Sequence, residues 1–130
     1  MAEMSNYLEN ALLNGTLNGT TYTAPTTVYV SLFTTDPTDA GSGTEVSGGS
    51  YARTAVTFAT ASGTSGLVAT DADVTFPTCT SSWGTVGWIG IHDASTSGNL
   101  LYHTALDASK TIDTGDIFKI TTGNLTVELA

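Results

Sequence analysis

The sequence predicts an all-β domain, mainly antiparallel, with one short N-terminal helix. Two observations support this prediction. Apolar and polar residues alternate with a period of two in several short runs, and Thr and Gly are abundant while only 12% of the residues are charged. Thr fits a pleated surface and Gly marks turns. We expect a β-sandwich or flattened barrel in a single domain, 1–130, with a helix and turn in 1–20 and the β domain in 21–130.

The predicted helix spans Ser5–Asn14. Ser5 can accept a hydrogen bond from an early amide, which caps the helix, and Gly15 can adopt the left-handed conformation that ends it. Leu8 and Leu12 lie on one stripe. A helix of about three turns is unstable alone in water. We therefore expect it to pack on the sheet or on a neighbouring chain.

The clearest strands are Thr27–Phe33 and Arg53–Ala59. In the first, Val30 and Leu32 alternate with polar or aromatic residues, which places them on one face. The polar loop Thr34–Ser50 joins the two strands. A loop this long in a compact domain is usually a binding element or mobile.

The remaining strands are shorter, and Val86–His92 is apolar on both faces. That pattern predicts a central strand covered on both sides. Trp88 lies within this strand and is expected in the core, whereas Trp83, in a polar turn, is expected at the surface. The other strand-like runs are Ala72–Phe76, Asn99–Leu106, Ile117–Thr121 and Leu125–Leu129. The predicted core is Val28, Val30, Leu32, Val56, Phe58, Val74, Phe76, Trp88, Ile89, Ile91, Leu100, Tyr102, Phe118, Ile120, Leu125 and Val127.

The charge balance argues against nucleic acid and anionic membranes as partners. The chain has 12 acidic and 3 basic residues, a net charge of −9 and a pI near 4.1. Arg53, Lys110 and Lys119 are too scattered to form the basic patch that phosphate binding needs. The chain has no apolar run long enough for a transmembrane helix and no secretory signal, so synthesis in the host cytoplasm is expected.

The chain shows no catalytic or metal-binding motif, so we expect no enzymatic activity, no cofactor and no metal. Cys79 is alone and is expected to be a buried, inert thiol. His92 and His103 are expected to be ordinary strand residues, without the spacing of a metal site or a nucleophile–base arrangement. The pair Asp36 and Asp39 is typical of turns. Structural Ca²⁺ in the acidic turns and a sugar-stacking surface around Trp83 are the alternatives.

The sequence resembles a family of small bacteriophage virion proteins that are often labelled tail-fibre-like. The segments that carry the resemblance cover most of the chain in the same order: SNYLENALLN, PTTVYVSLFTTDPTDAGSGTEVSGGSYARTAVTF, ADVTFP, WGTVGWIGIHDA, GNLLYHTAL, KTIDTGD and GNLTVELA. The resemblance implies a virion component without catalytic residues.

Within the virion, we expect a capsid cement or decoration protein on the outer surface of the head, because the chain lacks the repetitive stem of a fibre. Its expected partners are the major capsid protein and further copies of itself, most plausibly as a trimer. A tail-fibre or baseplate protein and a glycan-binding adhesin domain are the alternatives. Arg53 is expected to pair with an acidic residue of a neighbour. The candidate inter-subunit contacts are Tyr7, Leu8, Leu12, Asp36, Asp39, Glu45, Tyr51, Arg53 and Trp83.

Overall fold

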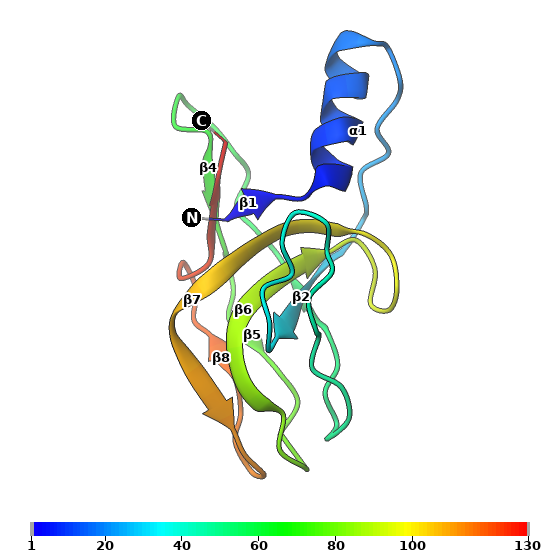
Figure 1. Cartoon of the computed structure of the whole chain (residues 1–130). Coiled ribbons are helices and arrows are strands. Elements are labelled where there is room, and N and C mark those ends of the chain that lie inside the picture. The colour runs from blue at the N-terminus through cyan, green and yellow to red at the C-terminus, as the bar shows by residue number, and fades with distance from the viewer. Residues whose placement is uncertain (1, 130) are drawn as a thin grey trace.

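A computed structural model describes residues 2–129 and confirms a mostly antiparallel β fold with one N-terminal helix (Figure 1). The sheets do not close into a barrel, so the arrangement is an open, flattened sandwich. The elements are β1 (Glu3–Met4), α1 (Asn6–Leu17), β2 (Val28–Phe33), β3 (Thr54–Val56), β4 (Leu67–Ala69), β5 (Val74–Thr75), β6 (Gly84–His92), β7 (Leu100–Ile112), β8 (Lys119–Ile120) and β9 (Thr126–Glu128).

The principal sheet has five strands in the order β1-β7-β6-β2-β3. Strand β6 lies between β7 and β2, which confirms the prediction of a central strand. It pairs with β2 from Tyr29↔His92 to Phe33↔Trp88. Strand β1 pairs with the beginning of β7, at Glu3↔His103 and Met4↔Tyr102, so the N-terminus forms one edge of the sheet.

One face of this sheet packs on the two-stranded sheets β4–β9 and β5–β8 to form the core. Phe76 and Phe118 meet there edge to face, with ring centroids 5.6 Å apart. Cys79 is buried, as expected. Twelve residues of the predicted core are buried: Val30, Leu32, Val56, Val74, Phe76, Ile89, Ile91, Leu100, Phe118, Ile120, Leu125 and Val127. Val28, Phe58, Trp88 and Tyr102 are only partly buried.

The predicted positions of the two tryptophans were wrong. Trp83 is only 4% exposed, and its indole Nε1 donates a hydrogen bond to the Gly49 carbonyl over 2.9 Å. Trp88 is half-buried, outside the core cluster. For Trp88 the cause is a register shift in the β6–β7 pair between Val86 and Trp88. Because the shift interrupts simple alternation, Val86 and Ile89 both contribute to the core and Trp88 does not.

Helix α1 is longer than predicted, because it continues through Gly15 to Leu17. Ser5 is the N-cap, as expected, and its hydroxyl accepts a hydrogen bond from the Leu8 amide at 3.3 Å. The helix ends at Asn18, and Gly19 takes the left-handed conformation that Gly15 was expected to take. Within residues 2–129, no helix has the length and apolar character needed to cross a membrane.

Candidate functional site

The second face of the principal sheet is covered by the N-terminal segment and the loop 34–50. The Ser5 amide donates to the Leu101 carbonyl over 2.9 Å, and the Ser5 hydroxyl bonds to the Leu100 carbonyl. The Asn6 amide donates to the Asp39 carbonyl over 2.8 Å. These bonds join the start of α1 to β7 and to the loop. We call α1 together with residues 34–50 the helix–loop face.

Most of α1 projects away from the sheet (Figure 1). Leu8, in its first turn, is the buried side chain of the helix. Tyr7 is 42% exposed, Leu13 54% and Leu17 75%. Large apolar side chains gathered on a projecting helix are typical of a docking surface. The sequence pattern identified Tyr7 and Leu12 as contact candidates but missed Leu13 and Leu17. Both leucines lie outside the apolar stripe of the helix, which is the signal that could have identified them.

The loop 34–50 is held by internal hydrogen bonds. The Asp36 carboxylate accepts from the Thr38 amide at 2.9 Å, so Asp36 is a turn residue as expected. Pro37 is fully buried. The backbone at Gly43 lies so close to Pro37 that a Cβ there would come within 2.7 Å of it. The loop is therefore a folded cover on the sheet.

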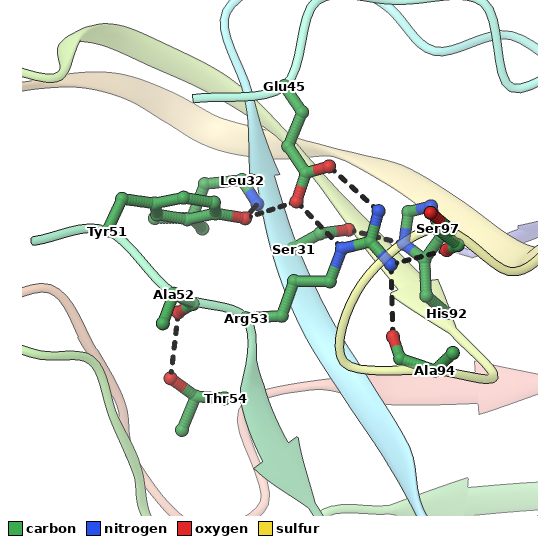
Figure 2. A network of polar contacts seen from close by, with 10 residues as sticks. All are labelled: Ser31, Leu32, Glu45, Tyr51, Ala52, Arg53, Thr54, His92, Ala94 and Ser97. Atoms are coloured by element: carbon green, nitrogen blue, oxygen red, sulfur yellow. Dashed lines mark hydrogen bonds and ion pairs between the residues drawn. The ribbon is translucent and has the colours of Figure 1, made fainter. Parts of the chain in front are cut away.

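A polar network joins this loop to β2 and to the turn between β6 and β7 (Figure 2). Arg53 Nε and Nη2 each donate to the Glu45 carboxylate over 2.9 Å. Arg53 Nη1 donates to the Ala94 carbonyl at 3.0 Å and the Ser97 carbonyl at 2.8 Å. The Tyr51 hydroxyl donates to Glu45 at 2.6 Å and accepts from a β2 amide. Arg53 thus pairs with an acidic residue of its own chain, where a neighbour's residue was expected.

The electrostatics keep this network ionised. Burial alone would raise the pKa of Glu45, but hydrogen bonds from Arg53 and Tyr51 outweigh it and hold that pKa below its ordinary value. The bond to Glu45 raises the pKa of Arg53. Burial, followed by the bond to Glu45, raises the pKa of Tyr51, so its hydroxyl remains a donor. The Arg53–Glu45 pair is therefore a charged clamp across neutral pH.

His92 and Ser31 form a second buried polar contact, with 2.8 Å between Nδ1 and Oγ. The imidazole stacks on Phe33 with centroids 6.1 Å apart. Burial, reinforced by the charge of Arg53, lowers the pKa of His92 to about 4. A serine beside a neutral histidine invites comparison with a nucleophile and its base. Here Ser31 is 0% exposed and His92 6%, so the pair is packed inside the domain.

The remaining predicted contact residues fall into two groups. Tyr7 and Leu12 lie on α1, where Leu12 is half-buried, and Asp36 and Asp39 lie on the covering loop. Leu8 and Trp83 are buried within their own chain. Whether any of these nine residues contacts a neighbouring subunit stays a prediction. Asp39 lies beside His103, with 2.8 Å between Oδ1 and Nε2, a contact that no sequence pattern indicated.

These features describe a β-structured module that carries a projecting apolar helix, which suits a structural component of an assembly. Residues 3–128 match the family described as podophage GP4 fiber I protein gp80, and the chain belongs to this family. The predicted membership of a phage virion structural family, labelled fibre-like, is thereby confirmed. No curated protein matches the chain.

Proposed function

We propose that this protein is a non-enzymatic structural component of a podophage fibre and that it joins neighbouring fibre or tail proteins through α1. The observation that supports this most directly is the exposure of Leu13 and Leu17 on a helix that leaves the sheet after its first turn. The family description names a fibre protein.

The helix suits a connector for a physical reason. Its first turn is held in place by Ser5, which donates hydrogen bonds to the Leu100 and Leu101 carbonyls of β7, and by the buried side chain of Leu8. The later turns keep their apolar side chains in water, where burial against a partner would contribute roughly 25 cal/mol per Å² of apolar surface removed. Because the first turn of α1 is already fixed, the exposed leucines can bind a partner with little further loss of conformational entropy.

Capsid cement is the second candidate. The compact single domain and the net charge of −9, which keeps the free protein dispersed, favour it. A cement protein binds the assembled lattice and stabilises it by mass action. In that role α1 would contact the major capsid protein, and loss of the protein would lower the temperature at which heads rupture.

Labelling the protein in intact particles separates the two candidates. If the protein belongs to a fibre, antibody-bound gold should lie on the tails in electron micrographs. Label distributed over the heads would instead support the cement proposal. The double variant Leu13→Ser, Leu17→Ser should fold normally and be lost from particles. The matched control is Ile117→Ser, which alters a residue 55% exposed outside the helix–loop face and should be incorporated like the wild type.

A further inference from the structure

Three segments that are distant in sequence bring ligand atoms together at the edge of the principal sheet. His103 of β7 has its Nε2 2.8 Å from Asp39 Oδ1 and 4.0 Å from Glu3 Oε2, and the three ligand atoms all lie within 4.8 Å of one another. The His103 side chain is 7% exposed, whereas those of Asp39 and Glu3 are 48% and 73% exposed. A buried imidazole therefore presents one nitrogen to two carboxylates that remain accessible to solvent.

The surroundings of this cluster are acidic. A hollow beside His103 is lined by Glu3 and also by Asp36 and Asp107, and no Lys or Arg is among its lining residues. Two of the three basic residues are engaged elsewhere, in the pairs Arg53–Glu45 and Lys119–Asp73. The third, Lys110, lines an adjacent groove that shares Asp107 with this hollow. Glu3, Asp36 and Asp39 have no Lys or Arg partner among the described ion pairs, so a cation that enters the hollow from their side meets negative charge.

We propose that Glu3, Asp39 and His103 form a binding site for a divalent transition-metal ion of the zinc class, although the sequence predicted no metal. A tetrahedral zinc ion with ligands at about 2.0–2.2 Å requires ligand atoms roughly 3.3 Å apart. The observed separations of 2.8 and 4.0 Å lie on either side of that value. Zinc replaces the proton that Nε2 donates to Asp39 Oδ1, and that proton is released to solvent. Small rotations of the two accessible carboxylates achieve the geometry, and water completes the fourth position.

The imidazole decides the class of metal. Ca²⁺ and Mg²⁺ bind almost entirely through oxygen, and Ca²⁺ takes six to eight such ligands. One nitrogen with two carboxylates suits zinc. Manganese should bind more weakly, because the affinity of such sites for Mn²⁺ is generally lower than for Zn²⁺. His103 thus supplies the ligand that an acidic cluster alone lacks.

The position of the site gives the ion a mechanical role. Glu3 belongs to β1, Asp39 to the covering loop and His103 to β7. The first residue of α1, Asn6, already bonds to the Asp39 backbone. A metal ion would cross-link these three segments and fix the direction in which α1 leaves the sheet.

The test uses the full chain after chelation, measured by calorimetric titration and thermal unfolding with Zn²⁺, Mn²⁺, Mg²⁺ and Ca²⁺ separately. We expect one zinc ion per chain and, at about a hundredfold excess over Kd, a rise in Tm of roughly 5–10 °C. Mn²⁺ should give a smaller rise. The absence of a saturable zinc isotherm, or equal responses to Ca²⁺ and Zn²⁺, would overturn the proposal.

Variants show whether the response belongs to these residues. Glu3→Gln alters an exposed side chain, so the protein should fold normally, and zinc affinity should fall at least about tenfold. Glu9→Gln, an exposed glutamate on α1 outside the cluster, is the matched control and should bind like the wild type. In NMR spectra zinc should move the imidazole signals of His103 and leave those of His92 in place. Unchanged affinity in Glu3→Gln together with unmoved His103 signals would refute the assignment.

Discussion

At the residue scale, Arg53 connects more of the structure than any other side chain in Figure 2. It bonds to Glu45 of the covering loop and to the carbonyls of Ala94 and Ser97. Its side chain is 10% exposed and that of Glu45 23%, so the charges are only partly screened by water. The pair fastens the loop 34–50 to the turn after β6. Arginine suits this position because its planar fork bonds a carboxylate bidentately.

We expect Arg53→Met to lower the free energy of unfolding by about 2–3 kcal/mol, because Glu45 and two carbonyls lose their donors. Chemical denaturation measures the change. Lys110→Met removes an exposed cation and should stay within about 0.5 kcal/mol of the wild type. Adding Glu45→Gln to Arg53→Met should restore part of the loss. Equal stability of Arg53→Met and the wild type would mean that the clamp contributes nothing.

His92 makes stability depend on pH in a defined window. Its folded pKa of about 4 lies below its ordinary value of 6.5, so the unfolded chain takes up the proton first. The contribution is complete above pH 6.5 and declines as pH falls toward 4. Between about pH 7 and pH 5 the wild type should lose about 2 kcal/mol more than His92→Gln. Glu45 does not interfere, because its pKa is lowered from 4.5. Identical pH profiles for the two proteins would contradict this account.

At the scale of elements, the packing of β2 and β7 side chains over β6 depends on Gly90. A Cβ at Gly90 would lie 2.6 Å from Ser31 Oγ, 2.8 Å from Leu100 Cδ1 and 2.9 Å from Phe33 Cε1. Such contacts are well below van der Waals separation. The glycine therefore leaves room for side chains of the two neighbouring strands, β2 and β7.

Gly90→Ala should destabilise the protein by about 1–3 kcal/mol through overpacking. Gly87, three positions earlier in the same strand, is the matched control, because a Cβ there meets nothing within 4 Å. Gly87→Ala should change the free energy of unfolding by no more than about 0.5 kcal/mol. Denaturant titration of both variants provides the comparison. The prediction fails when the two substitutions have equal effects.

The elements themselves were largely predictable, and their side-chain environments less so. Alternation in residues 28–33 is local, and it correctly placed Val30 and Leu32 in the core. The environment of Trp88 depends on a register shift against β7, and that of Trp83 on its contacts with Gly49 and Tyr51, which no local pattern reveals. Pairing of Asp39 with His103 likewise requires the tertiary fold. The projecting helix was predicted as an element, but its exposed leucines were recognised only when the sheet was in place.

At the scale of the whole molecule, the charge of −9 opposes association between copies. Raising NaCl from about 0.02 M to about 0.3 M shortens the Debye length from roughly 20 Å to roughly 6 Å. If the predicted homo-oligomer forms through apolar contacts, its association constant should rise over this range. Sedimentation equilibrium measures it. Association that weakens with salt would instead indicate an interface made of opposite charges.

The pairing of β1 with β7 also governs the order in which the protein is completed during translation. Glu3 lies 100 positions before its partner His103. At roughly 5–20 residues per second, the ribosome needs on the order of 5–20 s to make that interval. Throughout it β1 and the start of α1 are without β7, the strand that they contact. Glu3 and Met4 therefore take their place in the sheet only after about a hundred further residues have been made.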